Sequence, residues 1–466
     1  MLFSSLVFVF VFLPLTAAVY FLLPRRGEWR NWWLLLMSIL FYAWGEPKYV
    51  AIMLATVVLN WLGAVLLEKC GRGKQALLAL TVLADLSVLV YFKYFNFLAE
   101  NFNALFQTHV DFIKVVMPIG ISFYTFQALS YVVDVYRGEV KAQRNVLRLA
   151  LYISLFPQLV AGPIVKYHDV AEQIVGRTVS LADFAGGLRR FITGLAKKML
   201  IANTMGAIAD SVYAQTAAET SCAVAWLGAV AYALQIYYDF SGYSDMAIGL
   251  GRMFGFRFLE NFNYPYISRS ITEFWRRWHI SLSTWFKEYL YIPLGGNRVG
   301  SFRLYANLLI VFLATGVWHG ASWNFVVWGL WNGFFIVLER LTGFHKREGG
   351  FVFTALKHLY VVAVFLLGWV FFRADNLSLA FAYLKNMFGL VRHADAVHPC
   401  FVSNFDYMIL ALGMILACPI VRDRLYVDRG GLLRRLALDG WLVVLFALSV
   451  AWMVGATYNP FIYFRF

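Results

Sequence analysis

The sequence predicts an all-α membrane protein that crosses the bilayer many times. Of its 466 residues, 61% are hydrophobic and 14% are charged, whereas an ordinary soluble domain has roughly 45–50% and 25%. The net charge of +14 comes from Lys and Arg at the ends of apolar runs. That distribution is typical of the positive-inside rule and does not indicate a nucleic-acid partner. The composition excludes disordered chains, disulfide scaffolds and secreted enzymes.

The first apolar run, Leu2–Leu23, is expected to stay in the protein as a helix. It lacks the basic start of a signal peptide and contains Pro14. At ~1.5 Å per residue it is long enough for a hydrocarbon core of ~30 Å. Arg25, Arg26 and Arg30 follow it, so this end is expected at the cytoplasmic face.

Further apolar runs follow, and the usual window logic counts about eleven spans. The chain has no visible repeat, linker or soluble segment, which predicts a single membrane domain over residues 1–466. Prolines and a glycine break Leu149–Val165, and the amphipathic Leu181–Met199 is typical of an interfacial helix. The later runs are Trp32–Trp44, Tyr49–Leu67, Gln75–Tyr91, Val115–Val135, Val224–Ile236, Met246–Phe254, Leu304–Trp318, Ser322–Leu338, Leu359–Phe372, Tyr407–Ile420 and Trp441–Ala456.

His319 is expected at the turn of a membrane hairpin, because basic residues precede and follow the stretch Leu304–Leu338. The outward arm, Tyr305–Trp318, has 14 residues, or about 21 Å of helix, which is less than the hydrocarbon thickness. A re-entrant arm would leave His319 inside the membrane profile. An ionisable residue there is a functional candidate, and the alternative is a neutral histidine hydrogen-bonded between helices.

Two other segments carry polar groups between apolar flanks. The stretch Ile271–Arg298, which contains RRWHISLS (residues 276–283), has no continuous apolar span, so it either lies under the bilayer as an amphipathic helix or enters a protein-lined cavity. YYDFSGYSDMAIG, residues 237–249, carries Asp239 and Asp245. Both carboxylates could serve interhelical hydrogen bonding or function.

These groups favour acyl transfer with direct activation of the acceptor. A histidine can take the proton of a hydroxyl as it attacks a thioester carbonyl, and basic residues can hold the phosphates of coenzyme A. The chain has no P-loop, HExxH or GxSxG motif. Its histidines and four scattered cysteines lack metal-ligand spacing, so no bound metal is expected.

The segments FWRRWHISLSTWFKEYLYIPLGGNR (residues 274–298) and GVWHGASWNFVVWG (residues 316–329) resemble the membrane-bound O-acyltransferase family. The match is to its alginate O-acetylation branch. The likeness extends through nearly the whole chain, to PIGISFYTFQALSYVVDVYRG, LFPQLVAGPIVKY, YYDFSGYSDMAIG, GWVFFRA and the final NPFIYFRF.

The resemblance implies about eleven transmembrane helices, with re-entrant and interfacial helices, around a central tunnel. It implies an acetyltransferase of the bacterial inner membrane that takes acetyl from cytoplasmic acetyl-CoA, needs no permanently bound cofactor, and passes the group outward for O-acetylation of an exopolysaccharide. The implied partners are a periplasmic acetyltransferase or esterase-like protein and the polysaccharide synthesis complex. The histidine of the WHG motif is the catalytic residue of the family, here His319, and that of the RRWH motif, here His279, lies on the same pathway.

We expect lower-ranked contributions to substrate binding from Arg276, Arg277, Trp278, Trp318, Asp239 and Asn324. The alternative role of the two arginines is to anchor the protein at the membrane interface, and the alternative role of the tryptophans is packing. The same chemistry could serve cellulose or peptidoglycan, and D-alanyl transfer to teichoic acid fits the motifs less well. From other functional classes, a transporter or a non-enzymatic assembly subunit would share this composition.

Overall fold

We analysed a computed structural model that describes residues 1–216, 219–391, 402–419, 431–455 and 458–462. In this part of the chain all regular elements are helices, which confirms the predicted all-α class. The chain divides into two compact units, the first comprising residues 1–191 and 244–259, and the second residues 192–243 and 260–466. The prediction of a single membrane domain over residues 1–466 remains a prediction.

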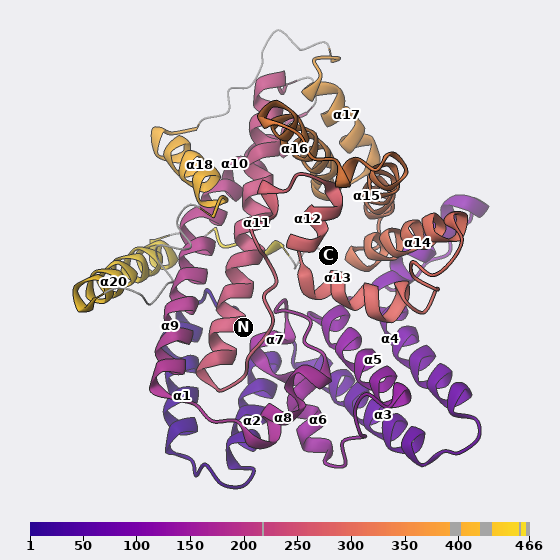
Figure 1. The fold of residues 1–466 in the computed structure, drawn as a ribbon, viewed down its shortest axis with the longest axis vertical. Coiled ribbons are helices and arrows are strands. Elements are labelled where there is room, and N and C mark those ends of the chain that lie inside the picture. Colours follow the sequence, from indigo (N-terminus) through magenta and orange to yellow (C-terminus); the bar gives the residue numbers. More distant parts are fainter. Residues whose placement is uncertain (217–218, 392–401, 420–430, 456–457, 463–466) are drawn as a thin grey trace. The chain divides into compact units, whose positions relative to one another are not determined.

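Unit 1 consists of helices that are close neighbours along the chain, such as α3, α4 and α5 in Figure 1. Its α5 has 17 residues, most of them buried on every side, including Gln127 and Asp134. The elements are η1 (Phe8–Phe12), α1 (Leu13–Leu22), α2 (Trp29–Ala43), η2 (Pro47–Tyr49), α3 (Val50–Lys69), α4 (Lys74–Phe106), α5 (Ile121–Arg137), α6 (Val146–Ser154), α7 (Phe156–Leu159), α8 (Tyr167–Gly176) and the first part of α9 (Leu181–Ala196).

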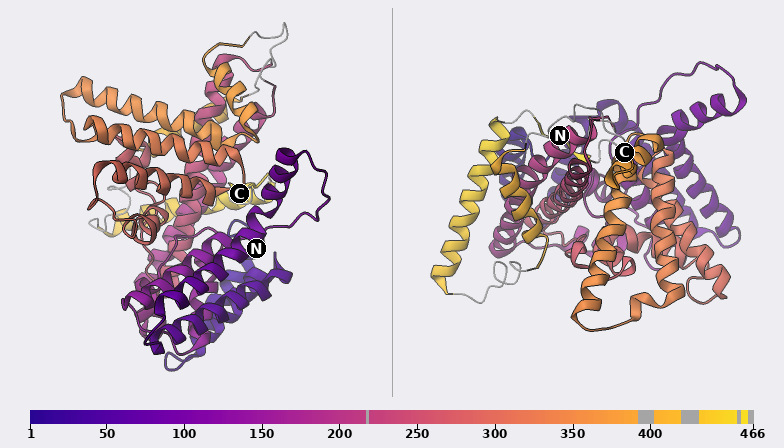
Figure 2. Two further views of the ribbon diagram at one scale, coloured as in Figure 1. Left: turned by 90° about the vertical axis from the view of Figure 1, so that its right-hand side faces the viewer. Right: turned by 90° about the horizontal axis from the view of Figure 1, so that it is seen from above.

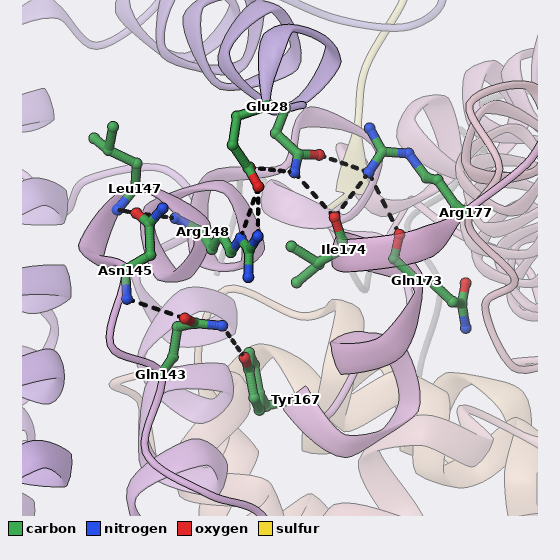
Figure 3. A network of polar contacts seen from close by, with 10 residues as sticks. Glu28, Gln143, Asn145, Leu147, Arg148, Tyr167, Gln173, Ile174 and Arg177 are labelled. Atoms are coloured by element: carbon green, nitrogen blue, oxygen red, sulfur yellow. Dashed lines mark hydrogen bonds and ion pairs between the residues drawn. The ribbon is translucent and has the colours of Figure 1, made fainter. Parts of the chain in front are cut away.

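A polar network connects the ends of several unit 1 helices (Figure 3). The Arg148 guanidinium donates to Glu28 Oε1, with Nε at 3.0 Å, and Asn31 donates to the other Glu28 oxygen at 2.8 Å. Arg177 donates to Asn31 Oδ1 at 2.6 Å. Because Glu28 precedes α2 and Arg148 lies in α6, the network brings the basic segments 25–30 and 137–148 to one end of the unit, as the positive-inside pattern requires.

Unit 2 is built around the long helix α11, of which residues 244–253 belong to unit 1. Its helices α14, α15 and α16 run side by side (Figure 2). The elements are η3 (Lys197–Ala202), α10 (Asn203–Tyr213), α11 (Cys222–Met253), η4 (Pro265–Ile267), α12 (Ile271–Arg277), α13 (Ile280–Phe286), η5 (Lys287–Tyr291), α14 (Ser301–His319), α15 (Trp323–Thr342), η6 (Phe344–Lys346), α16 (Phe351–Arg373), α17 (Leu377–Met387), α18 (Asn404–Leu416) and α20 (Leu432–Gly455).

Six helical segments of the described residues are long and apolar enough to cross a membrane, so the expected eleven spans are not confirmed. One reason is that runs such as Val115–Val135 correspond to helices buried inside the protein, where an apolar surface on all sides does not indicate lipid. The expected runs Val224–Ile236 and Met246–Phe254 fall on the single helix α11. Ile420 and Ala456, which end two expected spans, lie outside the described residues. The six are Pro47–Lys69, Lys74–Phe106, Ser301–His319, Trp323–Thr342, Phe351–Arg373 and Arg435–Gly455.

The arm that ends at His319 is longer than predicted. Helix α14 begins at Ser301 and has 19 residues, which is about 28 Å at the helical rise. It therefore qualifies as a full span by length and composition, and the argument for a short re-entrant arm was wrong. The expected arm begins at Tyr305, whereas the polar residues Ser301 and Arg303 already belong to the first turn of the helix.

Candidate active site

The RRWHISLS segment folds as two short helices that meet at His279. Ser270 caps α12 by accepting from the Glu273 amide at 3.0 Å. The buried Glu339 carboxylate accepts from the Ile271 and Thr272 amides, the latter at 3.0 Å. A carboxylate at a helix N-terminus is favoured by both the free N–H groups and the dipole. Since His279 and Trp278 are buried, the segment enters the protein interior, as one of the two predicted alternatives required.

His279 lies in an unusual backbone conformation at this break. Its φ is +45°, in the left-handed region, where a residue with a side chain is uncommon and costs energy to hold. The residue precedes α13, and the backbone amide of the next residue, Ile280, donates to Asn261 O at 2.9 Å. The surrounding hydrogen bonds thus hold a strained turn that directs the imidazole inward.

Asn261 fixes the tautomer of His279. Asn261 Oδ1 accepts from the Ser281 amide at 3.1 Å, and since a backbone N–H can only donate, this atom must be the oxygen of the side-chain amide. His279 Nδ1 lies 3.2 Å from the same oxygen and must therefore carry the ring proton. The buried Nε2, which has no hydrogen-bond partner within the described residues, presents a lone pair.

Burial keeps this imidazole neutral. The side chain is fully buried, and desolvation lowers the pKa of His279 to about 3. Phe240 packs edge-on against the ring at 4.6 Å between centroids. A neutral ring with a free Nε2 can accept a hydrogen bond at any physiological pH, although its low pKa makes it a weak proton acceptor.

His319 is held at the end of a tightly packed helix hairpin. A Cβ on Gly316 would lie 2.2 Å from Phe325 O, and one on Gly329 would lie 2.4 Å from Phe312 O. The two glycines therefore allow α14 and α15 to approach more closely than any side chain would permit. The turn ends at Ser322, which caps α15.

The two histidines meet inside unit 2, although 40 residues separate them in the sequence. Their ring centroids lie 6.5 Å apart, and His319 is 5% exposed. The His319 ring packs against Trp328 and Phe372, each at 5.1 Å. It contributes to a small pocket of about 10 Å³, which is room for about one water molecule. The pocket is lined by Ile236, Phe240, Trp278, His319, Trp328, Trp369, Phe372 and Ile462.

Only some of the other predicted binding residues lie at this pocket. Trp278 lines it, and the Trp318 ring lies 6.2 Å from that of His279. Asn324 is buried at the start of α15 and donates to Ala374 O. Arg276 is exposed on α12, and Arg277 forms an ion pair with Glu273 at 2.9 Å.

Asp239 does not line the pocket and instead contacts two other unit 2 groups. Its Oδ1 lies 2.7 Å from Lys198 Nζ, and its Oδ2 accepts from the Ile462 amide at 2.9 Å. The sequence reasoning missed Asn261, Lys198 and Ile462. The motif around residues 459–466 was noticed as part of the resemblance, but no spacing rule connects it to residue 319.

One set of possible metal ligands occurs in unit 1, although the sequence spacing predicted none. Asp134, Glu139 and His168 present ligand atoms within 4.8 Å of one another. Both ring nitrogens of His168 already have carboxylate neighbours, with Nδ1 at 2.9 Å from Asp134 and Nε2 at 3.3 Å from Asp169. Hydrogen bonding accounts for this arrangement, so the expectation of no bound metal remains a prediction.

Comparison with known proteins identifies the family. The chain is 45% identical over 396 residues to a protein of Azotobacter vinelandii named "Probable alginate O-acetylase AlgI", covering 84% of this chain and 78% of the relative. A protein of the same name from Pseudomonas putida is 40% identical over the full length of both chains. The "Peptidoglycan O-acetyltransferase" of Helicobacter pylori is 37% identical, covering 87% of this chain and 82% of the relative. The model of the membrane-bound O-acyltransferase family matches residues 141–382. With all its long apolar helices, the chain is thus a membrane enzyme, an acyltransferase that belongs to the membrane-bound O-acyltransferase family.

Proposed function

We propose that this protein is an O-acetyltransferase of the bacterial inner membrane that transfers acetyl from cytoplasmic acetyl-CoA toward O-acetylation of an alginate-type exopolysaccharide. The observation that carries the proposal is that His319 lines an apolar pocket, with the buried His279 ring 6.5 Å away between ring centroids. The names of the relatives support the acetyl group and the polysaccharide. A thioester is an acyl donor that an activated hydroxyl can attack, which supports acetyl-CoA, and the basic ends of the helices support a cytoplasmic face for the protein.

In the proposed mechanism His319 is the general base. Its imidazole takes the proton of an acceptor hydroxyl as the hydroxyl oxygen attacks the acetyl carbonyl of the thioester. The bond from carbon to sulfur then breaks, and the imidazolium returns the proton to the leaving thiolate. The products are an acetyl ester and the free thiol of coenzyme A, so the protein ends in its starting state.

His279 is proposed to orient a reactant and not to exchange protons. Its pKa of about 3 is far from the operating pH that a general base needs. Its Nε2 lone pair can accept the hydroxyl hydrogen bond and direct the oxygen toward the carbonyl. Asn261 acts through His279 and is a positioning residue.

The donor's charged end is proposed to lie outside the pocket, because the pocket walls carry no cation. Arg276 is exposed and available for a phosphate. Arg277 already pairs with Glu273, and we propose a structural role for it. A periplasmic acetyltransferase or esterase-like partner and the polysaccharide synthesis complex would receive the acetyl group, and no permanently bound cofactor is required.

The test is a transfer assay with purified protein, radiolabelled acetyl-CoA and soluble oligosaccharide acceptors, comparing the wild type with His319→Ala. We expect label on the acceptor, or in released acetate, with the wild type only. Transfer by His319→Ala at normal protein abundance would contradict the proposal. Because one relative is named for peptidoglycan, the acceptors should include mannuronate oligomers, cello-oligosaccharides and muropeptides, and the preferred acceptor decides the polymer.

A further inference from the structure

The segment Tyr458–Ile462 is held inside unit 2 by a series of polar contacts. Tyr458 donates its hydroxyl to Asp210 at 2.6 Å, and Asn203 donates to Tyr458 O at 3.4 Å. The Phe461 ring packs on Tyr243 at 4.6 Å. Phe461 and Ile462 are both buried, so this extended segment is part of the core although it lies far along the chain from α10 and α11.

A buried ion pair holds the last part of the segment. Lys198 and Asp239 are 3% and 2% exposed at their side chains, with Nζ and Oδ1 2.7 Å apart. Lys198 also donates to Pro460 O, and Asp239 accepts from the Ile462 amide. Burying two charges is costly unless further hydrogen bonds satisfy them. Here the backbone of the segment supplies those hydrogen bonds, so the pair and the segment require each other.

The same contacts place Ile462 in the wall of the candidate active site. Ile462 lines the pocket together with His319, and on α11 the residues Ile236 and Phe240 line it as well. Asp239 lies three residues after Ile236, on a neighbouring position of the helix surface. One stretch of α11 therefore both forms part of the pocket and fixes the residue that completes it.

We propose that Ile462, together with Ile236 and Phe240, forms the acyl-binding wall beside His319 and limits the acyl group to a short chain. Lys198 and Asp239 are positioning residues that hold this wall in place. The inference rests on the proposed function and specifies which part of the pocket receives the acyl group. The walls are aliphatic and aromatic, so they suit a methyl group, and a longer chain would have to displace the Ile462 side chain, which is closely packed in the core.

The experiment compares transfer from acetyl-, propionyl- and butyryl-CoA by the wild type and Ile462→Ala. We expect the ratio of propionyl to acetyl transfer to rise about 10-fold in the variant, since one methylene in a hydrophobic pocket changes selectivity by roughly 10–200-fold. Ile409→Ala is the matched control, because Ile409 is similarly buried in unit 2 and does not line the pocket. Its ratio should equal that of the wild type.

Two further substitutions at residue 462 keep the test informative if Ile462→Ala is too unstable to purify. Ile462→Val removes one methyl group and should raise the ratio by a smaller factor, whereas Ile462→Phe should lower propionyl transfer more than acetyl transfer. An unchanged ratio in an active, folded Ile462 variant would overturn the inference and leave the proposed function intact. If the wild type transfers no acyl group from any thioester, the proposed function fails and the inference fails with it.

Lys198 and Asp239 are tested by the same ratio. Lys198→Met leaves the Asp239 charge unpaired and removes the donor to Pro460, so we expect the ratio to rise as it does in Ile462→Ala. The double variant Lys198→Met/Asp239→Asn removes the unpaired charge and keeps an acceptor for the Ile462 amide, so the ratio should return toward the wild-type value. A folded Lys198→Met protein with the wild-type ratio would exclude the positioning role.

Discussion

The polar network at one end of unit 1 and the two histidines of unit 2 differ in how their polar side chains are bonded. In the network, the Glu28 carboxylate accepts from both Arg148 and Asn31, and Arg177 is bonded in turn to Asn31 (Figure 3). Beside the pocket residue His319, His279 Nε2 is buried without a hydrogen-bond partner among the described residues. Satisfied groups stabilise a fold, whereas an unsatisfied acceptor beside a cavity is available to a ligand.

Among the variants, His319→Ala should cause the largest loss of acetyl transfer while leaving the stability of the protein nearly unchanged. We expect acetyl transfer to fall about 10³-fold, within the 10²–10⁴-fold typical of general acid–base catalysis. The protein should remain folded, because the ring meets Trp328 and Phe372 edge-on and those two rings also pack directly against each other. Initial rates and the thermal unfolding midpoint in detergent check this, and a loss below tenfold would remove His319 from the catalytic role.

Asn261→Ala should have the next largest effect on activity. Without the Asn261 oxygen, the Nδ1 proton of His279 is no longer fixed, and the ring can present either nitrogen to the reactant. We expect kcat to fall by about 10–100-fold, the range found when hydrogen bonds that orient metal-binding histidines are removed, with a smaller change in KM. Asn307→Ala is the control, because Asn307 is equally buried but donates to Leu294 O away from the pocket. Equal losses in both variants would mean that only stability had changed.

The pH dependence of stability distinguishes the buried His279 from ordinary histidines. Its pKa is about 3 in the folded protein and about 6.5 when unfolded, so below pH 6.5 the unfolded chain binds the extra proton. Its contribution to stability is present above pH 6.5 and is lost between pH 6.5 and 3, at up to about 1.4 kcal/mol per pH unit. Thermal midpoints of the wild type should therefore fall more steeply on acidification than those of His279→Asn. His109→Asn, at an exposed position, controls for removing one imidazole, and parallel curves for His279→Asn would contradict the assigned burial.

Glu28→Gln should weaken the polar network of unit 1 and lower the free energy of unfolding by a small amount. The Arg148 hydrogen bond holds the pKa of Glu28 below its usual value, so the pairing contributes stability above about pH 4.5 and loses it as the pH falls further. We expect a loss of about 1–2 kcal/mol near pH 7 with unchanged activity per folded molecule. Glu100→Gln, which breaks a more exposed pair with Lys114, should cost less. A Glu28→Gln protein of normal stability but low activity would connect the network to function.

How much the sequence predicted depends on the range of each interaction. The all-α class follows from composition, whereas the roles of His319 and His279 come from a family resemblance and stay predictions. The contact of Asn261 with His279 depends on the left-handed turn at residue 279, which no periodicity indicates. The count of eleven spans is not confirmed, and α5 shows the difficulty, because burial in protein and burial in lipid select the same side chains. Asp239 resembled a substrate ligand, yet its partners Lys198 and Ile462 approach from 41 residues before and 223 residues after it.

The glycine crossing between α14 and α15 has a consequence for how the reaction proceeds. With Gly316 and Gly329 in backbone contact, neither helix can slide or rotate against the other without a collision of main-chain atoms. The backbone that carries the His319 imidazole is therefore held in place. On the proposed function, the acyl donor and the acceptor would have to come to this imidazole, because the helix that carries it cannot move toward them.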